Sequence, residues 1–346
     1  PDRSRLFPII SAPPIGRGRA GDYLGLSGEV LEINVTPDRG YCFAMRGVAR
    51  EYSHSTGAAF VDRGLEENLA NGLPPVNGEG FAVKVDDKAP IQGVPGCDRF
   101  VTRIVRDVDP QAPSPAWMQE RLTAAGMRPI SPAVDATNYV MLDLGQPLHA
   151  YDLDKLVEPI VVRRAREGET LVTLDKQERT LGGDDLLIPD SEGGEGERVI
   201  GLAGTMGGFD TEITAETTTV MIEAAHFDQV SVARMARKHR LPSEASKRFE
   251  RGVDPRIAPI AAQRVADLLV EYGGGTIDEA NFDYNVTETP ASVVFDVREV
   301  GRLTGLDLQT PQIVSVLEAI GCVVDEAADG VNLTVTPPTW RPPARG

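Results

Sequence analysis

The sequence predicts a multidomain α+β protein, in which a central mixed α/β domain is flanked by small helix-plus-hairpin domains. Three observations support this. The chain has 346 residues, more than one hydrophobic core usually organises. Helical and strand-like patterns alternate through its middle, as in α+β architectures. Near its end a helical pattern is followed by two strand-like runs around a hairpin turn.

The first small domain is expected over residues 1–75. Residues 30–35 alternate apolar and polar side chains, which predicts a strand, and residues 36–40 carry turn-forming Thr, Pro, Asp and Gly,. Apolar residues then recur at helical spacing, at Met45, Val48, Ala49 and Tyr52,. The domain should therefore end in a strand, a turn and a helix, followed by a Pro- and Gly-rich linker over 72–80.

The central domain is expected over residues 76–285. Ser114 and Pro115 have the types of an N-cap and a first-turn Pro, and Gly126 would end that helix,. Asp254 and Pro255 predict the start of a second helix, which Gly residues at 273–275 would end. Strand-like runs lie at 160–162, 170–174, 186–188, 199–202 and 219–222.

The last small domain is expected over residues 286–346. Thr310 and Pro311 predict the start of a helix that Gly321 ends, and two strands should flank the hairpin turn at Asp329 and Gly330,. The chain lacks an initiator Met and a signal-peptide pattern, and it ends in a Pro-rich run,. We therefore expect it to be a fragment of a larger protein.

Composition narrows the classes of function. No long uncharged apolar run is present, and three widely spaced Cys residues fit neither a disulfide framework nor a zinc ribbon,. We interpret the cysteines as reduced thiols and expect a cytoplasmic protein. The formal charge of −17 argues against wrapping of nucleic acid, because phosphate binding depends on Lys and Arg.

One segment is nevertheless basic, and nucleic acid could be contacted there locally. The cations crowded in it are Arg234, Arg237, Lys238, Arg240, Lys247, Arg248 and Arg251. Charge alone favours a solvated helix face. Signatures of four enzyme classes are absent, namely GxxxxGK[ST], GxGxxG, HExxH and GxSxG, and the four His residues lack metal-ligand spacing,. No metal ligands are predicted.

Four stretches place polar or small residues where a ligand could bind. An otherwise apolar run contains the polar residues Asp135, Asn138 and His149, although each alone could be a helix cap or a core residue,. Residues 201–208 are Gly-rich after a strand, which allows close approach of a ligand to the backbone. Glu223 follows directly after a run that looks like a buried strand, where a surface Glu at the end of the strand is the alternative. Residues 243–255 form a dense polar loop before a helix.

Together, these stretches resemble the beta subunit of bacterial phenylalanyl-tRNA synthetase, above all its central editing domain. The resemblance rests on VDATNYVMLDLGQPLHAYD at 134–152, GLAGTMGG at 201–208, MIEAAHFD at 221–228 and SEASKRFERGVDP at 243–255. It extends to LEINVTPDRGYCFAMRGVARE at 31–51, similar to the family's first domain, and to a small domain over 291–341. The central domain is thus expected to be an editing domain that hydrolyses tyrosine wrongly esterified to tRNA(Phe).

The resemblance also implies roles for individual residues. Glu223 would accept the tyrosine phenol, and Gly207 would leave room for the ring. His149 and Asn138 would serve as catalytic residues that position the attacking water, with His149 in proton transfer. Gly208, Ser243 and Ala245 would complete the substrate pocket. The cations expected to hold the tRNA are Arg234, Arg237, Lys238, Lys247 and Arg248.

Partners and cofactors follow from the resemblance as well. The full enzyme is expected to be a heterotetramer of two alpha and two beta subunits that binds tRNA(Phe), ATP and Mg²⁺. No cofactor is expected in this chain, which should not aminoacylate by itself. Ser243 stands where the family often has Thr, and Pro242 where Arg is frequent. The alternative is a scaffold that contacts tRNA and the alpha subunit but does not edit.

Overall fold

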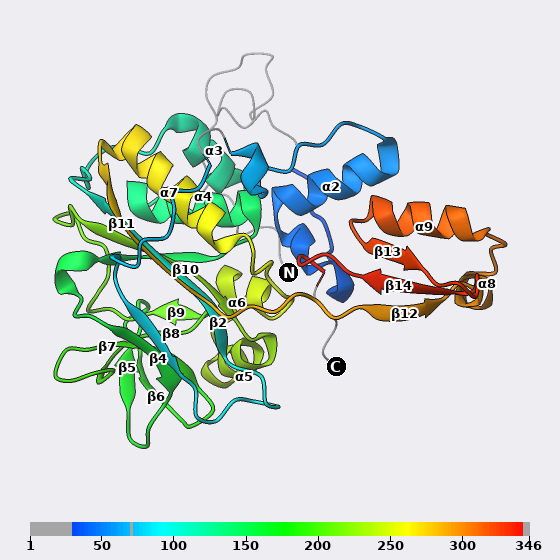
Figure 1. Ribbon diagram of the computed structural model, residues 1–346. Coiled ribbons are helices and arrows are strands. Elements are labelled where there is room, and N and C mark those ends of the chain that lie inside the picture. The colour runs from blue at the N-terminus through cyan, green and yellow to red at the C-terminus, as the bar shows by residue number, and fades with distance from the viewer. Residues whose placement is uncertain (1–29, 70–71, 342–346) are drawn as a thin grey trace, which may run out of the picture. The chain divides into compact units, whose positions relative to one another are not determined.

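A computed structural model describes residues 30–69 and 72–341. Figure 1 shows the described elements by label. The described residues from 35 to 341 belong to one compact unit. Three segments lie outside the described residues. They are residues 1–29, which hold the Pro- and Gly-rich start, residues 70–71, just before the expected linker at 72–80, and residues 342–346 of the Pro-rich end. Within the described ranges, no helix has the length and apolar character needed to cross a bilayer.

The strand expected at residues 30–35 is wrong. This stretch forms neither helix nor strand, and Val30, Leu31 and Ile33 are 67%, 83% and 54% exposed. An alternating pattern makes a strand only where a neighbouring strand satisfies its backbone. The turn that follows is a short 3₁₀ helix, η2 (Pro37–Phe43), and the expected helix is α2 (Met45–Thr56). A second 3₁₀ turn is η3 (Glu66–Asn68).

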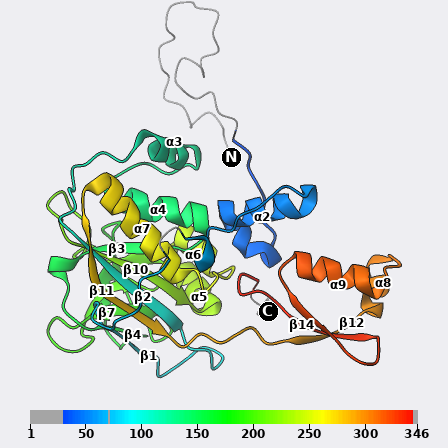
Figure 2. The ribbon, with the colours of Figure 1, turned by 45° about the horizontal axis from the view of Figure 1, so that its top comes forward.

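A four-stranded antiparallel sheet lies at the centre of the protein. Its order is β11 (Thr276–Asn285), β2 (Cys97–Arg106), β10 (Val220–Phe227) and β3 (Leu148–Asp152). Helix α7 (Ala258–Gly273) packs on β2 and β10, and α4 (Pro132–Leu144) packs on α7 and β3. Figure 2 shows these two helices over the sheet. Helix α3 (Ala116–Ala124) packs on α4.

A second sheet supplies the small residues of the site. Its order is β1 (Val83–Asp86), β4 (Ile160–Arg164), β7 (Leu186–Asp190), β8 (Arg198–Leu202) and β9 (Met206–Gly207). Only the β1–β4 pair is parallel. A hairpin joins β5 (Thr170–Val172) to β6 (Glu178–Thr180), and η4 (Leu153–Lys155) follows β3. Helices α5 (Gln229–His239) and α6 (Glu244–Phe249) come after β10.

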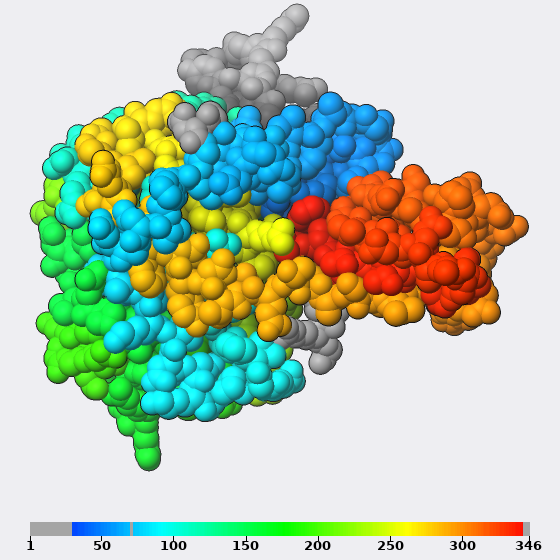
Figure 3. All heavy atoms as spheres, in the orientation of Figure 1, coloured from blue at the N-terminus to red at the C-terminus, as the bar shows by residue number. Residues whose placement is uncertain are grey.

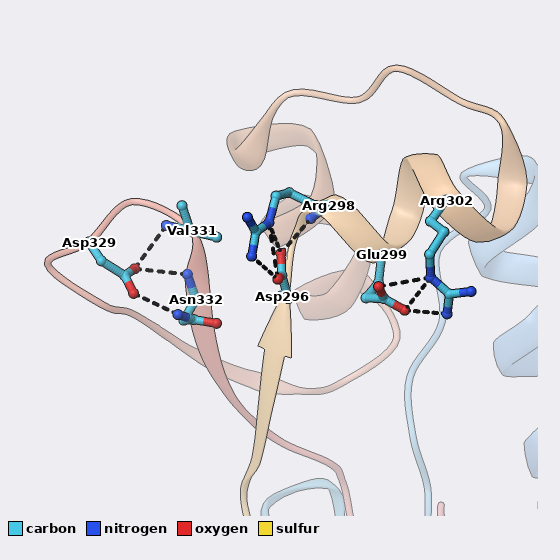
Figure 4. A network of polar contacts seen from close by, with 7 residues as sticks. All are labelled: Asp296, Arg298, Glu299, Arg302, Asp329, Val331 and Asn332. Carbon is cyan, nitrogen blue, oxygen red and sulfur yellow. Dashed lines mark hydrogen bonds and ion pairs between the residues drawn. The ribbon is translucent and has the colours of Figure 1, made fainter.

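The last domain has its own small core, as its sequence predicts. The sheet order is β12 (Val293–Asp296), β14 (Asn332–Thr336) and β13 (Val323–Glu326), and the last two strands form the expected hairpin. Helices α8 (Arg298–Thr304) and α9 (Thr310–Ala319) accompany it, and Ile313, Leu333 and Val335 are buried together. Figure 4 shows exposed contacts at one end of this domain, among them the Glu299–Arg302 ion pair.

The α+β prediction is confirmed, because mixed helices and sheets surround a central core that extends from Phe81 to Leu269. Each strand expected in the central domain is present. Two helix starts differ from expectation. Pro115 rather than Ser114 precedes α3, because the Ser114 hydroxyl donates to Asp135 Oδ2 at 2.6 Å. Helix α7 begins at Ala258 rather than at 254–255, and Gly274 ends it with φ of +69°,.

Buried charged residues connect α2 to distant parts of the chain. Arg46 Nε donates to Asp62 Oδ1 at 2.6 Å, and its Nη1 donates to Asp254 Oδ2 at 3.0 Å. Arg50 also donates to Asp62, and its guanidinium lies 4.0 Å from the ring centre of Trp340. Residues about 200 or more positions apart in the sequence therefore meet in one buried cluster.

Candidate active site

Neighbouring strands place the predicted acid and histidine opposite each other. In the antiparallel pairing of β10 with β3, Glu223 faces His149 and Met221 faces Tyr151. Residues opposite each other across a strand pair point to the same face, as do residues two apart along a strand. Glu223, His149 and Tyr151 therefore project together from the face of the sheet, and all three line one cavity of about 70 Å³.

Glu223 is a buried carboxyl group with a single hydrogen bond from the protein. The residue is 5% exposed, and the Tyr151 hydroxyl donates to its Oε2 at 2.7 Å. Burial raises the pKa of Glu223 to about 7, because desolvation disfavours the charged form; the Tyr151 bond lowers it in part,. No described residue donates to Oε1, so this oxygen can accept from a ligand.

His149 is neutral at physiological pH. Burial lowers the pKa of its imidazole to about 4, and Nε2 is buried without a hydrogen-bond partner,. The ring lies edge-to-face against Tyr151, with centroids 4.3 Å apart. A buried nitrogen without a partner is rare and costly in proteins, so this atom is suited to bind a polar group in the cavity.

Gly207 is required by the close approach of the His149 ring. A Cβ at this position would lie 2.6 Å from both Cε1 and Nε2 of His149. The neighbouring Gly208 has a different surrounding: its amide donates to Ile200 O at 2.7 Å, and it does not line the cavity. The Gly-rich run therefore contributes one residue that makes room for the His149 ring and one that pairs with β8.

Helix α6 covers another side of the cavity. Ser243 is its N-cap, accepting from the Ser246 amide, and the Ser243 hydroxyl donates to Thr205 O at 2.9 Å. This bond ties the helix to a loop that lines the cavity, whereas Ser243 itself does not line it. Ala245 and Phe249 of α6 are lining residues.

The predicted residues converge in part. The structure brings Glu223, His149, Gly207 and Ala245 to one cavity. Asn138 is a half-buried residue of α4 and is not among those that line it. Tyr151 received no role in the sequence analysis, although it lies two residues after His149 on a strand and so shares its face. That spacing was the signal that could have identified it.

The predicted tRNA-binding cations are in different environments. Arg234 and Arg237 of α5 are exposed, and their side chains make no ion pair or hydrogen bond in the described part of the chain. Lys238 pairs with Asp185 at 2.6 Å, and Lys247 with Glu244 at 2.6 Å. Arg248 is only 4% exposed and donates to Glu244 and to Phe43 O.

The chemistry available in the cavity is that of a carboxyl group, a neutral imidazole and backbone amides. Thr205 is the one lining residue with an aliphatic hydroxyl, and its Oγ1 donates to Ala203 O at 3.3 Å. No group of three His, Cys, Asp or Glu among the described residues could hold a metal ion. This arrangement can recognise a hydrogen-bond donor and orient a water molecule.

Comparisons with known proteins agree with this architecture. Residues 96–274 match the model of the B3/4 domain family, and residues 293–343 match that of the tRNA synthetase B5 domain. The first match spans more than half of the chain and contains all the residues described above as lining the cavity. The resemblance inferred from the sequence is thereby confirmed.

Two relatives with similar sequences are phenylalanine–tRNA ligase beta subunits. The chain is 54% identical over 324 residues to the phenylalanine–tRNA ligase beta subunit of Bifidobacterium longum, with 92% of this chain and 37% of the relative covered. It is 52% identical over 341 residues to that of Leifsonia xyli subsp. xyli, with 99% and 39% covered. The chain thus spans less than two fifths of the length of these relatives.

A solved structure is a more distant match. An N-terminal fragment of the phenylalanyl-tRNA synthetase beta-subunit from Pyrococcus horikoshii has 16% sequence identity and a TM-score of 0.38, covering 90% of this chain and 81% of that one. This likeness is too low to support an inference.

Proposed function

The chain belongs to the B3/4 domain family, and on this premise we propose that its cavity hydrolyses tyrosine wrongly attached to tRNA(Phe), as part of a phenylalanine–tRNA ligase beta subunit. The observation that carries the proposal is the buried carboxyl group of Glu223, which lines the cavity with Oε1 unoccupied by any described donor. A tyrosine phenol can donate to this oxygen, and a phenylalanine ring cannot.

Glu223 supplies the selectivity in this proposal. A site built to bond a hydroxyl rejects the analogue that lacks it, by roughly 10⁴ or more in favourable cases, because the buried polar group would remain unpaired. Tyr151 holds the carboxyl group from the other side through its bond to Oε2. Gly207 keeps the entrance open beside the His149 ring, where a side chain would collide.

His149 acts on the attacking water. Its lowered pKa, about 4, makes the imidazole neutral but weakly basic, so its main contribution is to orient the water through Nε2. The step needs no covalent nucleophile from the protein. A water oxygen bonds to the ester carbonyl carbon, the bond between that carbon and the ribose oxygen breaks, and the ribose oxygen leaves with the proton that the water gives up. The catalytic role of Asn138 stays a prediction, because this residue does not line the cavity.

The tRNA would be held beside the cavity by surface cations. Arg234 and Arg237 are exposed and unpaired among the described residues, which favours contact with phosphate oxygens. Lys238 and Lys247 can exchange their present partners for phosphate. Arg248 is buried and bonded within the protein, and its part in tRNA binding stays a prediction.

The complete protein would work with further components. The names of the relatives support a complex with an alpha subunit, and we propose the cytoplasm as its location. Aminoacylation by the complete enzyme would use ATP and Mg²⁺, and we assign neither to a described residue. The heterotetramer of two alpha and two beta subunits likewise stays a proposal.

Deacylation of tyrosyl-tRNA(Phe) by the complete enzyme tests the proposal. Glu223→Ala should slow this reaction at least tenfold, while Glu216→Ala, at an exposed position, should leave it unchanged. Glu223→Gln retains an acceptor and should lie between them. Equal rates for the wild type and Glu223→Ala would remove Glu223 from the mechanism, and no deacylation by the wild type would favour the scaffold alternative.

A further inference from the structure

A second cavity lies on the opposite side of β2 from Glu223. It has a volume of about 250 Å³ and lies between the segment 73–76, strands β2 and β11, and the start of α7. Three residues of β2 line it, namely Arg99, Val101 and Arg103, because alternate side chains of a strand point to the same face,. Thr102 points to the other face, and it lies opposite Glu223 in the pairing of β2 with β10. Figure 3 shows residues 72–80 (light blue) on the surface beside β11 (orange), where Asn77 bonds to Asn281.

Arg103 is a buried cation without a carboxylate partner. The residue is 6% exposed, and no acidic oxygen lies within 4.0 Å of its guanidinium among the described residues. Its Nη2 donates to Gln263 Oε1 at 2.6 Å, and its Nε is buried with no acceptor. A buried guanidinium is normally paired, because removing the charge from water is costly.

Among the described residues, no other charged group near the cavity accepts a hydrogen bond from Arg103. Arg99 forms an ion pair with Asp283 at 2.7 Å, so these two charges compensate each other. Asp267 accepts from Gln263 rather than from Arg103, and Glu66 is exposed to solvent, where its charge is screened,. Asp267 therefore attracts Arg103 only at longer range, and no carboxylate among the described residues contacts the Arg103 guanidinium.

The remaining wall is mostly apolar. The apolar residues that line it include Leu73, Pro74, Val76, Val101, Pro259 and Phe282. Ligand sites in proteins commonly combine such a wall with a few polar groups that fix orientation, and a guanidinium matches the planar geometry of a carboxylate. We propose that this cavity binds a small molecule with a carboxylate on an apolar body, and that Arg103 receives the carboxylate.

Binding of 4-methylpentanoate to the full chain tests this site, with 4-methylpentan-1-ol as the uncharged probe. Saturation-transfer NMR should show saturable binding of the acid, and at least tenfold weaker binding of the alcohol. Arg103→Met should weaken binding of the acid at least tenfold. Arg106→Gln is the matched control on the same strand, because the Arg106 side chain is about half exposed and outside the cavity; it should bind the acid as the wild type does.

A second variant covers the case in which Arg103→Met does not fold. Val76→Trp would fill the cavity from its rim, where Val76 is 58% exposed, and should abolish binding without altering Arg103. The proposal is overturned if the wild type shows no saturable binding, if the alcohol binds as well as the acid, or if Val76→Trp and a folded Arg103→Met bind normally. Because Glu223 lies on the other face of the sheet, tyrosyl-tRNA deacylation should be unaffected by Val76→Trp.

Discussion

Glu223 and His149 lie opposite each other, and burial moves their pKa values in opposite directions. The pKa of Glu223 rises from 4.5 to about 7, and that of His149 falls from 6.5 to about 4. Desolvation favours the neutral form of both groups. At neutral pH the cavity therefore holds a neutral imidazole beside a carboxyl group that is close to half ionised.

These two shifts predict opposite contributions to stability against pH. Between pH 4.5 and 7 the folded protein keeps the Glu223 proton that the unfolded chain has lost, so this contribution is lost as pH rises,. Between pH 4 and 6.5 the unfolded chain binds the His149 proton and the folded protein does not, so the histidine contribution grows with pH,. The two slopes largely cancel in the wild type.

Substitution should separate the two contributions. Relative to the wild type, Glu223→Gln should become more stable as pH rises from 4.5 to 7, by about 3 kcal/mol at most. His149→Asn should show the opposite trend from pH 4 to 6.5. Urea unfolding of both variants at a series of pH values measures this, and parallel curves for wild type and variants would contradict the burial of both groups.

Gly207→Ala tests the contact with the His149 ring. The new Cβ would lie 2.6 Å from two ring atoms, and such overpacking costs about 1–3 kcal/mol. We expect a lower melting temperature and slower deacylation of tyrosyl-tRNA(Phe). Gly183→Ala is the matched control, since a Cβ there meets nothing within 4 Å; a similar loss in both variants would refute the steric explanation.

Much of the candidate site could be predicted residue by residue from the sequence, and Asn138 and Tyr151 are the exceptions. Glu223, His149, Gly207 and Ala245 come from four separate stretches and line one cavity. Asn138 lies in the same stretch as His149, but the chain turns from α4 into β3 between them. Closeness in sequence therefore did not imply closeness to the cavity. Tyr151 was not predicted, because its residue type alone does not separate a site tyrosine from a core tyrosine.

At the scale of elements, α6 depends on its cap. The helix has only six residues, Glu244–Phe249, too few to be stable without tertiary contacts. Ser243 supplies both its N-cap and a bond to the loop at Thr205. The cap residue therefore also fixes the distance between Ala245 and the rest of the cavity.

Ser243→Ala should consequently affect stability and activity together. Loss of an N-cap costs about 1 kcal/mol, and release of the Thr205 contact should raise KM for tyrosyl-tRNA(Phe). Ser243→Thr retains the hydroxyl and should stay near the wild type in both measurements. Ser315→Ala, an exposed change in α9, controls for the substitution itself. An unchanged unfolding free energy in Ser243→Ala would mean that the cap is dispensable.

Strand patterns were confirmed where a partner strand is present, even in the largely exposed β5 and β13, and failed at residues 30–35, which have no partner strand among the described residues. Residues 160–162 form part of β4 and lie between two neighbouring strands. Residues 30–35 show the alternating pattern as well, yet three of their apolar side chains are more than half exposed. A pattern records what a strand could bury, whereas strand formation also needs a partner for the backbone.

At the scale of the molecule, a buried cluster of charges joins distant segments. Arg46 and Arg50 of α2 bind Asp62 and Asp254, and Trp340 stacks on Arg50 from the far end of the described chain. No local pattern could predict this cluster, because its members are up to about 290 residues apart. The domain boundaries at 75/76 and 285/286 stay predictions.

Asp62→Asn should destabilise the protein strongly. It would remove the acid shared by two buried guanidinium groups, and breaking a buried pair costs about 3–5 kcal/mol. Arg302→Gln, in the exposed pair with Glu299 shown in Figure 4, should leave the melting temperature unchanged,. Thermal unfolding compares the two, and a small effect of Asp62→Asn would show that α2 is not anchored through these charges.

The position of β10 between β2 and β3 also affects how ligands enter and leave the cavity. Amides in a strand bonded on both sides exchange with solvent only when much of the sheet opens, so Glu223 is carried by one of the two interior strands, β2 and β10, which should exchange most slowly. The six-residue α6 across the cavity is a much shorter element, and short elements open more readily than the middle of a sheet,. Ligands should therefore enter and leave by displacement of α6, while the carboxyl group that reads them stays in place.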